Sequence, residues 1–568
     1  MTTPAGDAVV DAARAWLDQD PDAETRAELE ALIASGTPEA LADLHDRFDT
    51  RLAFGTAGLR GEIAAGPNRM NRVLVAQAAA GIAAFLLRRA APGITPSVVI
   101  GYDGRKNSHV FATDSAEIMA GVGIRAILLP RLLPTPLVAF AVRELNVSAG
   151  IMVTASHNPP NDNGYKVYLG DADEGAQIVP PVDSFIAAEI LRVAAEESVA
   201  TMPRSNAYEI ADESVIEAYV AQTAAIIDRP EADAPQPLVV YTAMHGVGWE
   251  TFSRALDAAG FAAPVLVAEQ ISPDAAFPTV AFPNPEEPGA MDLAFATARS
   301  SGADLVIAND PDADRLAIAI PDSTTDEGYR RLTGNEVGAL LGWRAAERLR
   351  LAAKPGEPLA GTLACSIVSS PALSAVARDY GLAFQDTLTG FKWVSRAPGL
   401  VYGYEEALGY LVDPHVLRDK DGISAGLAFL ELAATLAATG ETIASQLDAF
   451  SMRFGHFASG QVSLRFTDVS EIAGLMNRLR KTPPREVGGI RVDRIEDLAA
   501  GSPELPASDV LRIWLVGGSR IMVRPSGTEP KLKVYIDTAC AEGTLAHRRE
   551  TAATLLTSLE DGMRALLA

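Results

Sequence analysis

The chain has few of the residues that disulfide scaffolds and zinc sites require. Among its 568 residues there are only two cysteines, Cys365 and Cys540, and they lack the spacing of metal ligands. Two isolated thiols are typical of a reducing compartment. Residues 1–16 also lack the basic and apolar regions of a secretory signal. We therefore expect a cytoplasmic protein with unpaired thiols.

Long apolar runs and net positive charge are also missing. The most apolar segment, residues 73–87, is too short to span a bilayer and ends at Arg88 and Arg89, so we expect a buried helix there. The net charge of −25 repels phosphodiester backbones and anionic lipid surfaces. Neither a nucleic acid nor a membrane is expected as a partner.

Several nucleotide-binding and hydrolase motifs are absent. The chain contains no Gly-Lys dipeptide, which excludes a P-loop, and neither GxGxxG nor GxSxG occurs. Lysine is scarce as well, with eight in the whole chain. Six of them lie in polar, glycine-rich segments, which favours a functional role for these amines: Lys106, Lys166, Lys392, Lys420, Lys531 and Lys533.

Short apolar runs that end in polar turns are the main pattern of the chain. Residues 97–100 precede GYDGRKNS, residues 150–153 precede TASHNPP, and residues 305–308 precede NDPDADR. Such runs predict strands buried on both faces, and Ala-rich helical stretches separate them, so we expect an α/β fold. In such sheets the carboxyl ends of the strands carry the functional site, which is where these polar turns fall.

The length and the 48% hydrophobic content predict several cores. We place domain boundaries at 1–205, 206–326, 327–454 and 455–568. The first domain includes an N-terminal helical extension, in which Asp22 is a candidate cap for a helix over 23–35. In the last domain, residues 461–466 and 531–536 alternate apolar and polar side chains, which predicts a half-exposed sheet of α+β type.

Three aspartates alternate in the segment NDPDADR: Asp310, Asp312 and Asp314. In an extended segment their carboxylates would project to one side and repel one another unless a cation lies between them. Hard oxygen ligands suit Mg²⁺ better than zinc. The alternative is a solvated acidic turn.

The segment RPSGTEPKLK can form a phosphate cradle. Arg524 and Lys533 supply positive charge, Ser526 and Thr528 supply hydroxyls, and Gly527 allows close approach of the backbone. An ordinary turn between two strands is the alternative.

The segment TASHNPPNDNGYKVY places Ser156, His157 and Lys166 just after a predicted strand. A serine hydroxyl needs a base or an electrophilic neighbour to react, and Lys166 acts as a base only if its pKa is lowered. Beside a metal site and a phosphate cradle, phosphoryl transfer is the favoured interpretation, although the segment alone could be a simple turn. In GYEEALGY, Glu405 and Glu406 could accept hydrogen bonds from sugar hydroxyls or lie in an exposed turn.

Together these motifs resemble the α-D-phosphohexomutase superfamily of phosphoglucomutase and phosphomannomutase enzymes, in particular the phosphoglucomutase-2/phosphopentomutase branch. The resemblance covers about residues 50–540. It rests on FGTAGLRG (54–61), GYDGRKNS (101–108), TASHNPPNDNGYKVY (154–168), NDPDADR (309–315), TGNEV (333–337), TGFKW (389–393), GYEEALGY (403–410), KDGIS (420–424) and RPSGTEPKLKVY (524–535).

The resemblance implies three related α/β domains and a smaller α+β domain around a central cleft. It implies that Ser156 is a phosphoserine, that Ser156 and the three aspartates bind Mg²⁺, and that His157, Lys166 and Arg60 assist catalysis. The substrate-binding residues that it implies are Thr56, Arg315, Gly390, Lys392, Glu405, Glu406, Lys420, Arg524, Ser526, Gly527, Thr528 and Lys533.

The implied reaction interconverts the 1-phosphate and 6-phosphate of glucose or mannose through a sugar 1,6-bisphosphate. Many hexose-specific relatives carry serine after the glutamates, whereas this chain has Ala407. Pentose phosphates therefore stay open as substrates, as do the activities of a bisphosphate synthase, a sugar phosphatase or a silent sugar-phosphate binder. We expect a monomer or homodimer.

Overall fold

The computed structural model describes residues 5–230, 235–466, 469–526 and 531–567. The chain forms two compact units. The first unit comprises Met1–Arg330 and Asp413–Glu431, and the second comprises Arg331–Val412 and Leu432–Ala568.

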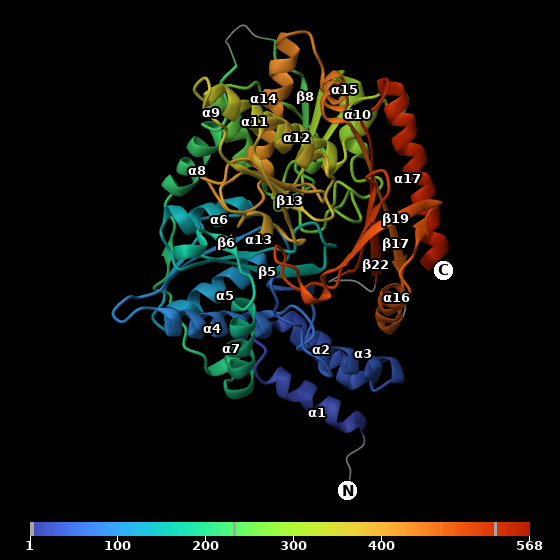
Figure 1. Cartoon of the computed structure of the whole chain (residues 1–568). Helices are drawn as coiled ribbons and strands as arrows, with labels where there is room; N and C mark the ends of the chain where they lie inside the picture. The colour runs from blue at the N-terminus through green and yellow to red at the C-terminus, as the bar shows by residue number, and fades with distance from the viewer. Residues whose placement is uncertain (1–4, 231–234, 467–468, 527–530, 568) are drawn as a thin grey trace. The chain divides into compact units, whose positions relative to one another are not determined.

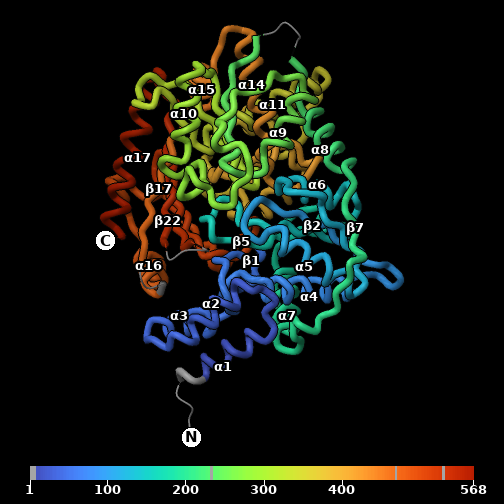
Figure 2. Tube along the Cα trace, turned by 180° about the vertical axis from the view of Figure 1, so that it is seen from behind, coloured from blue at the N-terminus to red at the C-terminus, as the bar shows by residue number. Residues whose placement is uncertain are grey.

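Three helices form the N-terminal extension of the first unit: α1 (Ala5–Leu17), α2 (Ala23–Ser35) and α3 (Pro38–Phe48). The predicted cap of α2 is confirmed, because the Asp22 side chain accepts a hydrogen bond from the Glu24 N–H at 2.9 Å. Trp16, Leu29 and Leu44 contribute to the core of the first sheet, so these helices are part of that domain's core. Both views show the three helices together at the N-terminal end of the chain (Figures 1 and 2).

The first sheet has seven strands in the order β1-β5-β4-β2-β3-β7, with β6 paired to β5. The strands β2, β3, β4 and β7 are parallel, whereas β5 is antiparallel to both β4 and β1. Their bounds are β1 (Leu59–Glu62), β2 (Ser97–Tyr102), β3 (Arg125–Leu128), β4 (Ala149–Val153), β5 (Asp162–Leu169), β6 (Ala176–Gln177) and β7 (Glu209–Ile210). The helices of this domain are α4 (Arg72–Arg89), α5 (Ser108–Gly121), α6 (Thr135–Glu144) and α7 (Val182–Glu196).

Helices cover both faces of the first sheet, as its fully buried strands predict. Helix α4, whose Val73–Ala79 stretch is buried throughout, confirms the predicted buried helix and shares one core with α5 and α7 (Figure 2). Helix α6 packs on the opposite face, where glycines permit a close approach. A Cβ on Gly101 or Gly150 would lie 2.4 Å from Val138 or Val142 of that helix.

The second sheet has the order β12-β11-β10-β8-β9, and its strands β8, β9 and β10 are parallel. Strand β11 returns antiparallel to β10. The bounds are β8 (Val239–Thr242), β9 (Val265–Leu266), β10 (Leu305–Asn309), β11 (Leu316–Pro321) and β12 (Tyr329–Arg331), with helices α8 (Ser214–Ala224), α9 (Gly248–Ala259) and α10 (Asp292–Ser301).

The third sheet, in the second unit, has the order β14-β13-β15-β16. Strands β14 and β15 are parallel to β13, and β16 is antiparallel to β15. The bounds are β13 (Thr362–Ser366), β14 (Ala383–Thr387), β15 (Leu400–Glu405) and β16 (Gly409–Leu411), with helices α11 (Gly334–Ala352), α12 (Ala372–Tyr380), α13 (Phe391–Val394), α14 (Gly422–Ala438) and α15 (Ile443–Phe454). Among the described residues no single helix is long and apolar enough to cross a membrane, and α14 with α15 reaches that length and apolarity only as a bent pair.

The fourth sheet is antiparallel, with the order β17-β22-β21-β20-β19-β18. The prediction of a half-exposed sheet is confirmed in β17, where Val462 is buried between exposed Gln461 and Ser463. Helix α17 packs along β17 and β22 (Figure 1). The bounds are β17 (His456–Arg465), β18 (Glu486–Val487), β19 (Ile490–Asp497), β20 (Leu511–Leu515), β21 (Arg520–Pro525), β22 (Lys531–Cys540), α16 (Val469–Lys481) and α17 (Leu545–Leu567), and short 3-10 helices lie at Asp171–Asp173, Val199–Thr201, Ala268–Gln270 and Leu498–Ala500.

The three α/β sheets carry polar motifs at the same topological position. In each, the motif joins a parallel strand to the antiparallel strand beside it. Ser156 lies between β4 and β5, the three aspartates lie between β10 and β11, and Glu406 lies between β15 and β16.

Candidate active site

Ser156 lies in a tight turn between β4 and β5. Its φ of 52° falls in the left-handed region, which few non-glycine residues adopt. The Ser156 N–H donates to Thr154 Oγ1 at 2.8 Å, and its Oγ donates to Asp310 Oδ2 at 2.9 Å. The side chain is thus buried, fixed by its own turn and directed at the first aspartate of the β10–β11 turn.

Arg105 anchors the backbone of the Ser156 turn. This buried side chain donates to the carbonyl oxygens of Ser156 and Asn158 at 2.6 Å, of Pro159 at 2.8 Å and of Asp162 at 3.2 Å. Four backbone carbonyls in one turn are therefore tied to a single guanidinium, whose planar fork of donors suits that arrangement.

Asp103 supports the same turn. Its carboxylate accepts hydrogen bonds from Ser108 Oγ and Thr154 Oγ1, both at 2.6 Å, and from the Arg105 N–H at 3.0 Å. Neither Asp103 nor Arg105 is among the site residues that the sequence predicts. The available signal was the polar segment GYDGRKNS directly after a buried strand.

Asp310, Asp312 and Asp314, the aspartate trio, are completely buried. One carboxylate oxygen from each lies within 4.8 Å of the other two. The expectation of an extended segment was wrong, because residues 311–313 form a turn in which Ala313 has a φ of 54°. The carboxylates converge because the chain curls around them.

Two lysines and a hydroxyl contact the aspartate trio. Lys166 Nζ lies 2.7 Å from Asp312 Oδ2 and 2.6 Å from Asp314 Oδ2. Lys420 Nζ also pairs with Asp314, and Thr135 Oγ1 donates to Asp312 Oδ2 at 2.6 Å. Lys420 comes from the segment Asp413–Glu431, which belongs to the first unit although the chain reaches it after the third sheet.

These contacts determine how the buried groups ionise. Burial would raise the pKa of Asp312, but the charges of Lys166 and Lys420 hold it below its usual range. Burial and the charges of the other two aspartates raise the pKa of Asp310. Burial would lower the pKa of Lys166, but Asp312 and Asp314 raise it. The contacts of Lys166 therefore raise its pKa instead of lowering it, which favours the charged ammonium over a base.

His157 is the neutral neighbour of Ser156. Its Nδ1 lies 3.1 Å from Ser156 Oγ and 4.0 Å from Asp310 Oδ2. Burial lowers the pKa of the imidazole well below its ordinary value, and the nearby charges of Arg315 and Arg60 act in the same direction. A neutral imidazole at this position can accept a proton.

Arg60 and Arg315 each lie close to a neighbour of Ser156. Arg60, on β1, donates to Asn158 Oδ1 at 3.2 Å, and Arg315 Nε lies 3.9 Å from Asp310 Oδ2. Thr56 is half-buried in the turn before β1. Gly58 lets that turn lie against β5, because a Cβ there would be 1.7 Å from the carbonyl oxygen of Tyr165.

The aspartate trio has the donors that a hard divalent cation requires. Asp312 Oδ1 and Asp314 Oδ1 are buried and have no hydrogen-bond partner among the described residues. Buried carboxylate oxygens without partners are costly unless a cation binds them, and three carboxylates suit Mg²⁺. The residues present therefore fit this metal.

In the second unit, the glutamate turn (residues 405–408) is held by neutral donors. Ser366 Oγ and Ser369 Oγ donate to Glu406 Oε2 at 3.0 and 2.9 Å. The Gly390 N–H donates to Glu405 Oε1 at 2.8 Å, and Lys392 follows on α13. The predicted glycine, lysine and glutamates thus lie on neighbouring segments of one domain.

The predicted phosphate cradle lies at the end of the β21–β22 hairpin, also in the second unit. Arg524 and Lys533 are directly opposite in the ladder, so their side chains are neighbours on one face. The Ser526 N–H donates to the Lys531 carbonyl at 2.8 Å across the hairpin. Gly527 and Thr528 lie outside the described residues.

Comparison with family models covers most of the chain. Residues 51–197, 217–323 and 333–452 match the phosphoglucomutase/phosphomannomutase alpha/beta/alpha domains I, II and III, and residues 471–553 match the C-terminal domain of the same family. The four-domain α/β architecture follows from these matches and from the four sheets.

Two relatives and one solved structure illustrate the similarity. The Haemophilus influenzae protein "Probable phosphomannomutase" is 49% identical over 88% of this chain and 98% of its own length. The mouse protein "Phosphopentomutase" is 35% identical over 93% of this chain and 90% of its own length. A Burkholderia thailandensis structure described as a phosphoglucomutase/phosphomannomutase family protein superposes with a TM-score of 0.69 at 20% identity, over 91% of this chain and 97% of its own. The chain belongs to the phosphoglucomutase/phosphomannomutase family, in its phosphoglucomutase-2/phosphopentomutase-like branch, and is a phosphosugar mutase.

Proposed function

We propose that the chain is a Mg²⁺-dependent mutase that interconverts the 1-phosphate and 6-phosphate of a hexose, glucose or mannose. The reaction would proceed through a phosphoserine at Ser156 and a sugar 1,6-bisphosphate. The observation that carries this proposal is the 2.9 Å contact between Ser156 Oγ and Asp310 Oδ2, which joins a buried hydroxyl to the aspartate trio. The free cysteines Cys365 and Cys540 are in keeping with a cytoplasmic enzyme.

The transfer step uses groups around Ser156. The bond between phosphorus and Ser156 Oγ breaks as a sugar hydroxyl oxygen bonds to the same phosphorus. The hydroxyl proton passes to His157, whose neutral imidazole already contacts Ser156 Oγ. The guanidinium groups of Arg60 and Arg315 stabilise the charge on the transferring phosphoryl group.

The aspartate trio would hold the Mg²⁺ together with the Ser156 phosphate, and the bound metal supplies neutralisation of the phosphoryl oxygens. Lys166 and Lys420 hold Asp312 and Asp314 as carboxylates. Lys166 keeps its positive charge beside Asp312 and Asp314, and His157, which has taken the sugar hydroxyl proton, gives that proton to Ser156 Oγ as the phosphoryl group departs.

The second unit would bind the rest of the substrate. Glu405 and Glu406 accept hydrogen bonds from sugar hydroxyls, and the two serines that hold Glu406 leave its second oxygen, Oε1, available. Arg524, Ser526 and Lys533, with Gly527 and Thr528, clasp the phosphate that is not transferring. Thr56, Gly390 and Lys392 would complete the substrate contacts. After the first transfer the bisphosphate turns around, and Ser156 takes back the other phosphate.

Pentose phosphates are the second candidate substrates. Ala407 removes a hydroxyl from the glutamate turn, where a hydrogen bond to a hexose would contribute roughly 0.5–1.5 kcal/mol. The mouse relative also carries the name phosphopentomutase.

The test is product analysis by ³¹P NMR with glucose, mannose and ribose 1-phosphates, for the wild-type chain and Ser156→Ala. We expect the wild-type chain to convert a hexose 1-phosphate fastest and without net phosphate release, and we expect the variant to lose nearly all turnover while keeping its fold. Normal turnover by Ser156→Ala would contradict the proposed nucleophile. A faster rate on ribose 1-phosphate would select the second candidate, and released inorganic phosphate would indicate a phosphatase.

A further inference from the structure

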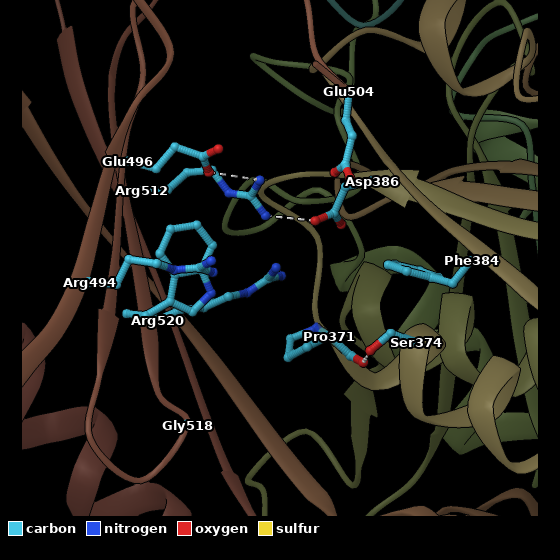
Figure 3. A pocket seen from close by; sticks show the side chains of 11 residues that line it. Pro371, Ser374, Phe384, Asp386, Arg494, Glu496, Glu504, Arg512, Gly518 and Arg520 are labelled. Carbon is cyan, nitrogen blue, oxygen red and sulfur yellow. Dashed lines mark hydrogen bonds and ion pairs between the residues drawn. The ribbon is translucent and has the colours of Figure 1, made fainter. Parts of the chain in front are cut away.

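A polar cavity of about 380 Å³ lies in the second unit, between the third-sheet domain and the fourth sheet. Its charged lining comes from β14, from strands β19 to β21 and from the segment before β20 (Figure 3). The charged residues are Asp386, Arg494, Glu496, Glu504, Arg512 and Arg520, and we call this space the arginine cavity.

The arginine cavity is separate from the predicted phosphate cradle. Arg520 is the first residue of β21, and Ser526 follows the far end of that strand. An extended strand rises ~3.3 Å per residue, so about 20 Å separate the two positions. No residue of the aspartate trio, the Ser156 turn or the glutamate turn lines the cavity.

Two polar atoms in the cavity wall lack partners. Arg512 is buried and its terminal nitrogens bond Asp386 Oδ2 at 2.6 Å and Glu496 Oε2 at 3.3 Å. Its Nε and the second oxygen of Asp386, Oδ1, are buried without a hydrogen-bond partner among the described residues. Both atoms are closed off from solvent, so they show only that the charged groups in this wall are incompletely paired.

The wall formed by the fourth sheet presents positive charge. Arg494 lies over the Trp514 ring, 3.7 Å from its centroid, and makes no ion pair within the described part of the chain. Arg520 donates to Asp537 at 2.9 Å and also to the carbonyl of Ser369. Figure 3 shows the guanidinium groups of Arg494 and Arg520 extending toward the cavity, across from Pro371 and Ser374.

The opposite wall adds a helix N-terminus. Helix α12 begins at Ala372 after Pro371, which supplies no side-chain cap, and both Pro371 and Ser374 line the cavity. The Ala372 N–H donates to Ser370 Oγ at 3.3 Å and the Ser374 N–H to the Pro371 carbonyl at 3.0 Å, so it is the helix dipole that favours an anion at this position. Together with Arg494 and Arg520, the helix end makes a site for a phosphate group.

Acceptors at the rim would recognise the rest of the ligand. Glu504 is exposed and makes no ion pair with any described residue. Its carboxylate oxygens can accept hydrogen bonds from hydroxyl groups. From this arrangement we propose that the arginine cavity is a second binding site, for a small organic phosphate that bears hydroxyl groups.

The site has a short connection to the glutamate turn. Arg520 donates to the Ser369 carbonyl, and the Ser369 hydroxyl donates to Glu406. A phosphate bound by Arg520 therefore lies close to the residues that hold a predicted sugar contact.

Binding of inorganic phosphate and of glycerol 3-phosphate tests the proposal, measured by calorimetry on the full chain. All measurements use a background variant that carries two substitutions. Ser156→Ala prevents group transfer, and Arg524→Gln weakens phosphate binding at the predicted cradle. In this background, Arg494→Glu should weaken binding of both probes at least about tenfold, because a charge-assisted contact becomes a repulsive one. Arg491→Glu is the matched control, since it makes the same charge change at another exposed position of β19 and should change binding less than about twofold.

Glu504→Gln separates the two parts of the ligand. It should weaken glycerol 3-phosphate binding and leave inorganic phosphate binding unchanged. Equal losses in Arg494→Glu and Arg491→Glu would overturn the proposal, since they would show a general charge effect. Absence of binding in the background would overturn it as well, as would equal effects of Glu504→Gln on both probes. No turnover is measured, so these outcomes are independent of the proposed mutase reaction.

Discussion

The turn between β10 and β11 and the turn between β15 and β16 occupy the same position in two similar sheets, but they surround their acids differently. The aspartate trio is fully buried, and two lysines contact it. Glu406 is half-buried, and two serine hydroxyls hold it. Lysine ammonium groups lie against the acids of the first turn, whereas neutral serine hydroxyls hold Glu406 in the second.

The different surroundings of the two groups of acids suit them to different roles. Buried carboxylates that repel one another are stable only with cations nearby, and such a site can hold Mg²⁺ beside a phosphate. A half-exposed carboxylate that two hydroxyls hold through one oxygen can offer its other oxygen to a ligand. We therefore expect the aspartate trio to neutralise charge and the glutamate turn to recognise the ligand.

The largest effect should come from Asp310→Asn. The substitution removes one charge of the aspartate trio at the contact with Ser156, so we expect kcat to fall by about 10²–10³-fold at saturating sugar phosphate and Mg²⁺. Steady-state kinetics over a range of Mg²⁺ concentrations measure this loss. A decrease of less than about tenfold would mean that the trio does not assist transfer.

Glu406→Gln should have a smaller effect of a different kind. A hydrogen bond to a charged acceptor contributes about 1.5–3 kcal/mol, so kcat/KM should fall roughly ten- to hundredfold, mainly through KM. The control is Glu357→Gln, which changes an exposed glutamate of the same unit. A loss confined to kcat would remove the distinction between the two turns.

Arg105→Lys should reduce kcat by about tenfold with little change in Mg²⁺ binding. An ammonium has three donors and lacks the planar fork, so it cannot hold all four carbonyls of the Ser156 turn. Calorimetric titration with Mg²⁺ alongside the kinetics separates positioning from metal binding. An equal loss of metal affinity would show that Arg105 supports the aspartate trio instead.

The smallest expected effect is on the stability of the fold and concerns Glu213, an acid that lies outside both turns and is partly exposed to solvent. Hydrogen bonds from Arg131 and then Arg254 outweigh desolvation and lower its pKa to about 2. A lowered pKa in the folded state stabilises the protein above the usual value of 4.5, and this contribution disappears as the pH falls toward 2. Its side chain is 43% exposed, so the gain is below about 1 kcal/mol.

Thermal melts of Glu213→Gln against the wild-type chain measure that contribution. The variant should have a slightly lower Tm than the wild-type chain at pH 7, and this difference in Tm should shrink as the pH falls below 4.5. A Tm difference that grew on acidification would contradict the lowered pKa of Glu213.

Local patterns were enough to predict many elements. The buried runs before the polar turns are strands β2, β4 and β10, Asp22 caps α2, and residues 461–466 alternate as predicted. These features depend on neighbouring residues, whose periodicity and capping chemistry are visible in the sequence.

Long-range contacts were not predictable in the same way. Arg105 reaches a turn more than fifty positions later, and Lys420 meets an aspartate that precedes it by 106 positions. The direction of the Lys166 pKa shift also depends on ion pairs that only the fold brings together, so the sequence left it open. The turn at residues 311–313 was not predicted, because alternating aspartates are compatible with both a strand and a turn.

The most direct test of the account asks where the transferred phosphate resides. The full chain is incubated briefly with glucose 1,6-bisphosphate and Mg²⁺, quenched, and analysed by intact mass and peptide mapping. Ser156→Ala and Ser205→Ala are treated in parallel, and Ser205 is a half-buried loop serine of the same domain. The account predicts one phosphate on the peptide that contains Ser156, present in the wild-type chain and in Ser205→Ala and absent from Ser156→Ala. Phosphate on another residue, or equal labelling of Ser156→Ala, would contradict it.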